Sequence, residues 1–393
     1  MLNHGYSKHI EQYRGLCALL VMLIHGIATE HILFDTYTLP RFVNYFGAGY
    51  LSVLVFFCIS GYVIAINYDT AHLDVKTYIK KRLIRLYPIY IFSIVMTVLV
   101  TGIMNMDTLG NVFFLQNFVP YGHIYIVPSL NFPIWSLNFE VLYYLLFIGL
   151  FFIKPKIWQS LLIMLIISLS MIHADQGLRF LPCYVNGYYF WILGLLIGWN
   201  IIKGNQKQAR PINLLSLLFL HMATNLLDEG QIALHGFGVF TNTSFNGLFF
   251  LSFCLMIMTT LTNQDNAFLR FNKFLCYTLP VVAFVYLIAV HRIFENAHWT
   301  MCLVFWLLSL AFYFETKVSA FLMEKLTPVG KISYGLYLLH VPVGLLLKRF
   351  ISLDDIRIEI AVKYTLWLLI TFTLSYLLER KLQPAIKRYF TPR

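Results

Sequence analysis

Long apolar runs alternate with short polar segments along the whole chain, and most of the runs have the length of a membrane-spanning helix. About 20 consecutive apolar residues cross the ~30 Å hydrocarbon core of a bilayer as an α-helix. Such runs lie at about 13–30, 47–67, 84–103, 135–153, 157–173, 182–201, 212–227, 245–262, 274–293, 299–314, 332–348 and 362–378. The pattern predicts an all-α, polytopic bundle of about 10–12 transmembrane helices, and the lower number applies if short runs such as 212–227 and 299–314 are re-entrant.

Composition agrees with a membrane protein and limits the kinds of partner. Of the 393 residues, 59% are hydrophobic and 12% are charged, whereas a soluble domain carries about 25% charged residues. The net charge of +11 comes from short clusters of Lys and Arg between apolar runs, without the extended basic face of a nucleic-acid-binding protein. We therefore expect membrane lipid, and no nucleic acid, among the partners.

The Lys and Arg clusters fall in alternate loops, which predicts the orientation of the chain. With the N-terminus placed inside, most of the 29 Lys and Arg residues lie in segments on the inner side. Cytoplasmic loops of membrane proteins carry such an excess of positive charge, so both termini are expected in the cytoplasm. A single membrane domain over residues 1–393, with no fused soluble domain, accounts for the sequence.

Six cysteines are scattered through the apolar runs without CxxC spacing: Cys17, Cys58, Cys183, Cys254, Cys276 and Cys302. Isolated cysteines of this kind are typical small core residues, not a disulfide framework or a ligand set. No metal site is predicted.

The first apolar run begins with an arginine and contains a histidine. Arg14 and His25 are eleven residues apart, so on an α-helix they point from one face, and His25 lies about 16 Å further along the axis. That is about half the thickness of a ~30 Å hydrocarbon core, where an ionisable side chain is costly and often functional. A hydrogen bond from His25 to a neighbouring helix, with Arg14 marking a cytoplasmic helix end, explains the two residues equally well.

Two further arginines lie at the start of the third run, in KKRLIRLYP. Arg82 and Arg85 share a helix face, and two guanidinium groups near Arg14 would suit the oxygen atoms of phosphate groups. Simple positive-inside anchoring is the other explanation. The stretch FFCISGY ends the second run on the same side, and its Ser60 and Gly61 allow close approach, either for helix packing or for a binding surface.

A carboxylate lies within the fourth run, which reads WSLNFEVLYY from Trp135 and Ser136 onward. Tryptophan is common at membrane interfaces, and Glu140 lies about 7–8 Å deeper than Trp135. Because a buried carboxylate needs a partner or a proton, Glu140 either pairs with a helix-end arginine or has a function, orienting His25 or holding a hydroxyl group. The long outer loop at about 104–134 is either a lid or platform over the bundle or a plain connection.

The stretch GKISYGLYLLH opens the eleventh run with a polar stripe. Ser333 and Tyr337 are four residues apart, and Tyr337 and His340 are three apart, so all three lie on nearly one helix face. His340 is a second histidine within an apolar run, and a hydrogen bond in helix packing explains it as well as a function does.

Taken together, these stretches resemble the acyltransferase-3 family of integral membrane acyltransferases. The pair Arg14–x10–His25, then FFCISGY, RLIRLYP, WSLNFE, GKISYGLYLLH and SYLLERK follow the family's order and span nearly the whole chain. Arg14 and His25 match the family's essential Arg–x10–His pair, and Arg82 and Arg85 match its RxxR. The sequence departs from the family at Cys58-Ile59, where FFVLSG is common, and at Glu379-Arg380-Lys381, where ERP is common.

The resemblance implies a bacterial inner-membrane enzyme that moves an acyl group, most often acetyl from acetyl-CoA, onto a hydroxyl group of a carbohydrate such as O-antigen, capsule or exopolysaccharide. The expected catalytic residues are His25, as general base or as nucleophile, and Glu140. Acyl-CoA is expected to contact Arg14, Arg82, Arg85 and Ser60, and the carbohydrate acceptor Trp135, Ser136, Tyr337 and His340. The expected mechanism uses acetyl-CoA as donor substrate and no metal.

Two other functions are compatible with a bundle that has few buried polar groups. One is a transporter or flippase for a polysaccharide or lipid-linked sugar, which gives no reason for arginines to converge near His25. The other is a membrane scaffold for glycan assembly, which leaves the intramembrane polar groups unexplained.

Overall fold

A computed structural model of the chain describes residues 8–27, 32–35, 45–68, 73–116, 131–153, 180–202, 207–208, 213–227, 250–290, 293–294, 297–314 and 317–390, with the single positions 159, 162 and 166. Apart from those three positions, the predicted span at 157–173 lies outside these residues, and so do residues 117–130 of the loop at 104–134.

Among the residues that the structure describes, six helical segments are long and apolar enough to cross a membrane: α1 (Lys8–Ile27), α2 (Gly49–Asn67), α3 (Val75–Thr101), α5 (Trp135–Ile153) with the preceding turn, α12 (Ala267–Ala289), and the segment Ile356–Phe390. A bent pair, Ser319–Gly330 with Ser333–Phe350, counts as a seventh if its two arms form one span. Shorter apolar helices lie at Gly187–Trp199, Leu214–Leu227, Leu251–Leu261 and Ala297–Ala311. The prediction of an all-α polytopic bundle is confirmed.

The remaining elements complete the bundle. They are α4 (Met106–Val112), the short turn η2 (Phe132–Ile134), α7 (Phe180–Ile202), α8 (Leu214–Leu227), α11 (Leu251–Leu261), α13 (Ala297–Ala311), α14 (Lys317–Glu324), α15 (Leu326–Gly330), α16 (Ser333–Phe350), α17 (Ile356–Leu377), the π-helix η5 (Leu378–Leu382) and α18 (Gln383–Phe390). Two strands of two residues each, β1 (Lys207–Gln208) and β2 (Gln264–Asp265), pair antiparallel.

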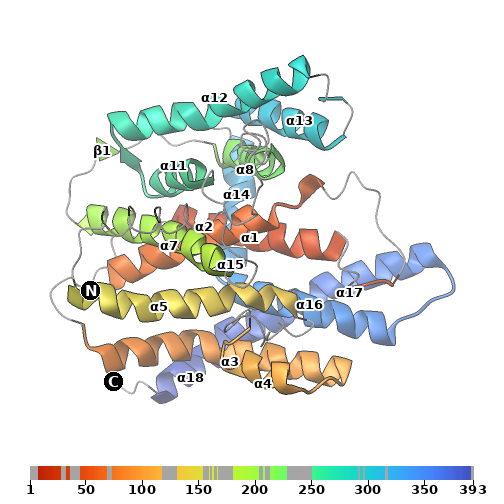
Figure 1. The fold of residues 1–393 in the computed structure, drawn as a ribbon. Coiled ribbons are helices and arrows are strands. Elements are labelled where there is room, and N and C mark those ends of the chain that lie inside the picture. Colours follow the sequence, from red (N-terminus) through yellow and green to blue (C-terminus); the bar gives the residue numbers. More distant parts are fainter. Residues whose placement is uncertain are drawn as a thin grey trace.

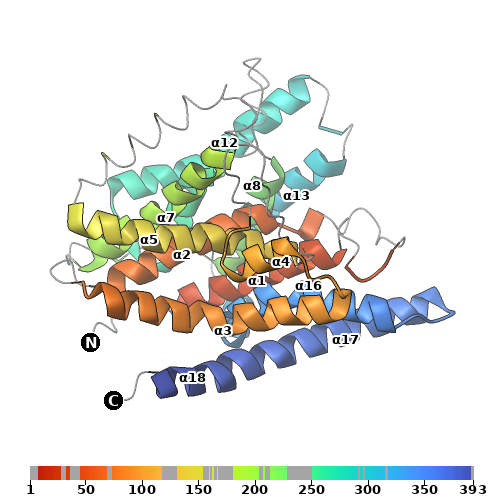
Figure 2. The same cartoon turned by 60° about the horizontal axis from the view of Figure 1, so that its bottom comes forward.

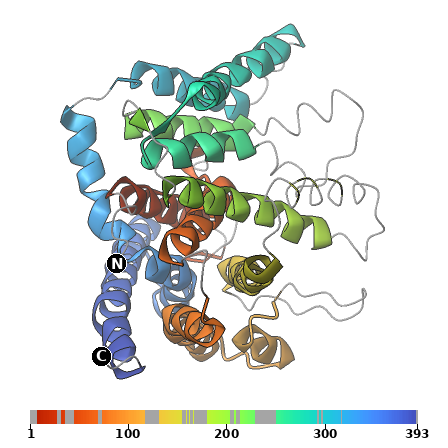
Figure 3. The ribbon, with the colours of Figure 1, turned by 90° about the vertical axis from the view of Figure 1, so that its left-hand side faces the viewer.

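The helices α1 and α2 lie in the middle of the bundle, with α12 and α13 on one side and α3 on the other (Figures 1 and 3). In Figure 2, α17 and α18 form one continuous rod that runs beside α3. The α3 helix begins where the Asp74 side chain accepts hydrogen bonds from the backbone N–H groups of Lys76 and Thr77, and it ends at Gly102 with a left-handed φ of 72°. These boundaries place Arg82 and Arg85 in the first half of α3.

Glycines allow the central helices to touch through their backbones. A Cβ atom on Gly61 of α2 would overlap the carbonyl of Trp191 in α7, and one on Gly194 of α7 would overlap the carbonyl of Cys58. A Cβ atom on Gly330 of α15 would overlap the carbonyl of Glu11 in α1 in the same way. Small residues at such crossings let membrane helices approach closely, so Gly61 serves helix packing while the neighbouring Ser60 remains available for contacts elsewhere.

Candidate active site

A cavity of about 530 Å³ lies among α1, α2, α3, α5 and the first turns of α16, and its charged lining is mainly basic. Five cationic and two anionic side chains border it: Arg14, Arg82, Arg85, Lys331, Arg380, Glu11 and Glu140. We call it the basic cavity. It brings together Arg14, Arg82, Arg85 and Ser60, which were expected to share one ligand and come from three different helices.

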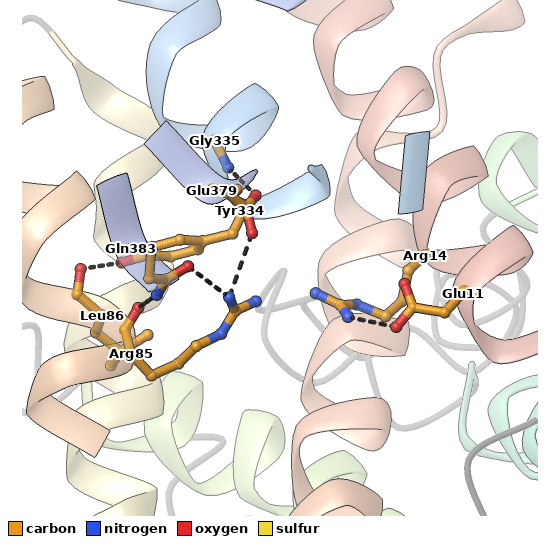
Figure 4. Close-up of polar contacts among 8 residues, drawn as sticks. All are labelled: Glu11, Arg14, Arg85, Leu86, Tyr334, Gly335, Glu379 and Gln383. Atoms are coloured by element: carbon orange, nitrogen blue, oxygen red, sulfur yellow. Dashed lines mark hydrogen bonds and ion pairs between the residues drawn. The ribbon is translucent and has the colours of Figure 1, made fainter. Parts of the chain in front are cut away.

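Arg85 is fixed by the chain segment that contains the π-helix. Its guanidinium donates hydrogen bonds to the carboxylate of Glu379 (3.2 Å) and to the side-chain oxygen of Gln383 (3.0 Å). The other carboxylate oxygen of Glu379 accepts from the backbone N–H of Gly335 in the first turn of α16, at 2.7 Å (Figure 4). The sequence pattern gives no sign of these contacts of Glu379 and Gln383, because 294 residues separate Glu379 from Arg85.

Arg82 is held by aromatic rings and not by a carboxylate. Its guanidinium carbon lies 5.5–5.8 Å from the ring centroids of Tyr68, Tyr78 and Tyr144. The Nε of Arg82 is buried without a hydrogen-bond partner, and no described carboxylate forms an ion pair with this side chain. An unpaired buried donor costs about 1–3 kcal/mol, so an anionic ligand beside Arg82 would be bound favourably.

Arg14 approaches the same space from α1. Its guanidinium pairs with Glu11 at 3.4 Å, and it points across the cavity toward the guanidinium of Arg85 (Figure 4). In this arrangement carboxylates contact both arginines, and the cavity still lies between them.

The first turn of α16 adds donors to the same cavity. The Oγ of Ser333 lines the cavity and is buried without a hydrogen-bond partner, and the N-cap residue Ile332 provides no side-chain acceptor. Helix N-termini favour anions, so arginines, a free hydroxyl and a helix N-terminus all suit phosphate groups here. Within the described residues, no group of three or more His, Cys, Asp or Glu side chains is placed to hold a metal ion.

Glu140 belongs to the basic cavity, and its hydrogen bonds are made there. The Oγ of Ser60 donates to Glu140 Oε1 at 2.8 Å, and the hydroxyl of Tyr144 donates to the same oxygen. The ring of Tyr144 in turn lies beside Arg82. The expected orienting contact from Glu140 to His25 is replaced by a contact from another residue, because position 140 of α5 faces the basic cavity.

That other contact is made in a second cavity, of about 430 Å³. It is lined by Val21, Ile24, His25, Gly47, Gly49, Tyr50, Val53, Trp135, Asn225 and Tyr337, and we call it the histidine cavity. His25 lies in the last turn of α1, with Phe132 edge-on to its ring at a centroid distance of 4.7 Å.

His25 and His340 form a hydrogen-bonded pair. Their rings are parallel within 8°, and Nδ1 of His25 lies 2.8 Å from Nε2 of His340. Nδ1 of His340 lies 2.9 Å from the carbonyl oxygen of Leu336, which can only accept, so this nitrogen carries a proton. A neutral His340 therefore presents a lone pair at Nε2, and His25 must donate from Nδ1. The remaining nitrogen of His25, Nε2, is then unprotonated and can accept a proton.

The helix α17 holds this pair in place. The indole N–H of Trp367 donates to the carbonyl of His340 at 2.7 Å, and the hydroxyl of Tyr364 donates to the carbonyl of Gly26 at 2.8 Å. A Cβ atom on Gly26 would overlap the ring of Trp367. The sequence alone does not reveal these contacts, because Tyr364 and Trp367 lie within an apolar run and contact residues up to 338 positions away.

The four residues expected to contact an acceptor occupy different places. Trp135 and Tyr337 line the histidine cavity, and Ser136 lines the basic cavity. His340 is fully buried and hydrogen-bonded through both ring nitrogens, so it contacts His25 and not a ligand.

Val53 and Tyr337 line both cavities. The basic cavity therefore ends where the histidine cavity begins, and Arg14 and His25, on one helix, reach different cavities that adjoin each other.

The family of the chain is shown by a comparison with known families. A family model described as an acyltransferase domain, acyltransferase-3, matches residues 8–380. No curated protein and no solved structure matches the chain. The family match covers nearly the whole chain and includes every residue of the two cavities named above. The chain belongs to the acyltransferase-3 family of membrane acyltransferases.

Proposed function

We propose that this membrane acyltransferase transfers an acyl group, acetyl in the first instance, from acyl-CoA to a hydroxyl group of a carbohydrate or glycoconjugate such as O-antigen, capsule or exopolysaccharide. The observation that carries the proposal is the junction of two unlike cavities. A basic cavity suited to phosphate groups adjoins one that contains a histidine with an unprotonated nitrogen. The proposed location is the bacterial inner membrane.

Acyl-CoA would occupy the basic cavity. Its phosphate groups suit Arg82, whose Nε has no partner, and the pair Arg14 and Arg85. Arginine binds phosphate oxygens through two parallel N–H groups. The positive-inside pattern predicts that the start of α1, and so this cavity, lies on the cytoplasmic side, where acyl-CoA is made.

The acceptor would occupy the histidine cavity. Trp135 and Tyr50 offer aromatic surface to a sugar ring, and the side chain of Asn225 adds a polar amide to the lining of this cavity. His25 would contact the reacting hydroxyl group. Binding sites for small molecules commonly combine an apolar lining with a few polar groups that fix orientation.

In the proposed reaction, Nε2 of His25 accepts the proton of the acceptor hydroxyl as its oxygen attacks the thioester carbonyl carbon. The carbon–oxygen bond forms and the carbon–sulfur bond breaks. The sulfur leaves as a thiolate and takes the proton from His25, so the products are an O-acyl ester and CoA with a free thiol. While His25 is positively charged, its hydrogen bond to His340 is charge-assisted and therefore stronger.

The proposal is tested by mass spectrometry of surface glycans from a host with and without this gene. We expect the gene to add one acyl group per modified sugar, and His25→Ala to remove it, since a general base contributes about 10²–10⁴-fold. His9→Ala, at an exposed position of the same helix, is the matched control and should keep the modification. Normal acylation by His25→Ala would contradict the catalytic role. A loss of surface glycan with no change in its acylation would indicate transport instead.

A further inference from the structure

The junction of the two cavities consists of two side chains from two helices. Val53 of α2 and Tyr337 of α16 each border both the basic cavity and the histidine cavity. The neighbouring residues of α5 divide between the cavities, with Trp135 on the histidine side and Ser136 on the basic side. The two cavities therefore adjoin at these side chains.

The same order holds along the helices that cross this boundary. On α2, Tyr50 lines the histidine cavity, Val53 lines both, and Phe56 lines the basic cavity. On α16, Tyr334 lines the basic cavity, Tyr337 lines both, and His340 holds the histidine of the second cavity. Consecutive helical turns thus meet the basic cavity, the junction and the histidine pair in turn.

Both side chains at the junction are restrained. The hydroxyl of Tyr337 donates to the carbonyl of Pro133 at 2.8 Å and accepts from Ser136 Oγ at 2.7 Å. Phe56 packs edge-on against the ring of Tyr337, with the two ring centroids 6.0 Å apart. Val53 is buried, and a β-branched side chain in a helix strongly prefers one χ1 rotamer. Neither side chain can turn aside without losing contacts, so both keep their positions at the junction.

We propose that Val53 and Tyr337 set the length of the acyl group that the enzyme transfers. The inference rests on the proposed function. The reacting carbonyl must lie at the junction, because its thioester arrives through the basic cavity and the acceptor oxygen through the histidine cavity. With the acceptor in place, the tail of the acyl group packs against Val53 and Tyr337. A methyl tail, as in acetyl, fits beside valine, and its two methyl groups disfavour longer tails.

The test compares donors in membrane vesicles that contain the protein and the host glycan. Acetyl-CoA, propionyl-CoA and butyryl-CoA are supplied separately, and the release of free CoA thiol is measured above that of His25→Ala vesicles. Val53→Ala should raise the ratio of butyryl to acetyl transfer by about tenfold or more, since one methylene group in an apolar pocket changes discrimination by about 10–200-fold. Val53→Leu should lower transfer from every donor longer than acetyl.

Val63→Ala is the matched control, because Val63 lies on the same helix and lines the basic cavity but not the histidine cavity. It should keep the wild-type ratio of donors. An unchanged ratio in both Val53 variants, or an equal shift in Val63→Ala, would overturn the inference while leaving the acyltransferase proposal intact. If wild-type vesicles release no more thiol than His25→Ala vesicles with any donor, the proposed function itself is wrong.

Discussion

The basic cavity and the histidine cavity differ in the number of charged side chains that line them. The basic cavity is bordered by seven charged side chains, and some of its polar atoms, Arg82 Nε and Ser333 Oγ among them, have no partner. Among the described residues that line the histidine cavity there is no Lys, Arg, Asp or Glu, and the orientation of His25 depends on one neutral partner, His340. Under the proposed function, this difference corresponds to a division of work, in which charge would bind the donor in one cavity and an imidazole would accept a proton in the other.

The strongest test of this division is the removal of His340. His340→Leu leaves Nδ1 of His25 without an acceptor, so the ring can turn and the proton can move to Nε2. We expect kcat to fall by about 10²-fold, with the KM for acetyl-CoA nearly unchanged because the basic cavity is intact. Steady-state acyl transfer in membrane vesicles measures both constants.

His340→Gln distinguishes positioning from simple packing. A glutamine carbonyl can accept the proton of His25 Nδ1, so this variant should recover much of the activity that His340→Leu loses. If leucine and glutamine were equally inactive in folded protein, or if leucine had no effect, His340 would have only a structural role.

The sequence predicts only in part which of these residues share a cavity. Arg82 and Arg85 are three residues apart on one helix, so their common cavity follows from helical periodicity. Arg14 and His25 also share a face, yet about 16 Å of helix separates them, and the structure places them in different cavities. Helical spacing predicts direction along one helix and cannot predict which other helices close off the space between.

Contacts between distant segments were not predictable for a related reason. His25 and His340 are 315 residues apart, and their pairing requires α1 and α16 to lie side by side. Glu379 contacts Arg85 from within a π-helix, Leu378–Leu382, a local irregularity often found at functional sites. The apolar pattern predicts where the helices lie along the chain, but these contacts depend on how the helices pack against one another.

A second prediction concerns the basic cavity. Arg82→Ala should weaken the binding of acetyl-CoA by about 10–100-fold, as expected for one hydrogen-bonded charge worth about 1.5–3 kcal/mol, and should leave the proton transfer at His25 unaffected. Arg82→Lys should recover only part of the loss, because lysine keeps the charge but lacks the planar pair of donors. Isothermal titration in detergent measures the affinity.

Lys80→Ala provides the control for Arg82, since Lys80 is exposed on the same helix two residues earlier. Its affinity for acetyl-CoA should equal that of the wild type. Equal weakening in Lys80→Ala and Arg82→Ala would mean that only the general positive charge of this surface matters. Unchanged affinity in Arg82→Ala would leave Arg82 as a signal for membrane orientation.

The smallest effect is expected at Glu140, which lines the basic cavity and not the histidine cavity. Glu140→Gln keeps an oxygen that can accept from Ser60 and Tyr144, so it preserves the hydrogen bonds of this part of the basic cavity. Activity should fall by less than about tenfold, the range of an ordinary hydrogen bond, and the change should appear in the KM for acetyl-CoA because Tyr144 also contacts Arg82. The same vesicle assay measures it. A fall in kcat as large as that of His25→Ala would show that the carboxylate takes part in the step at His25, and the separation between the two cavities would then be wrong.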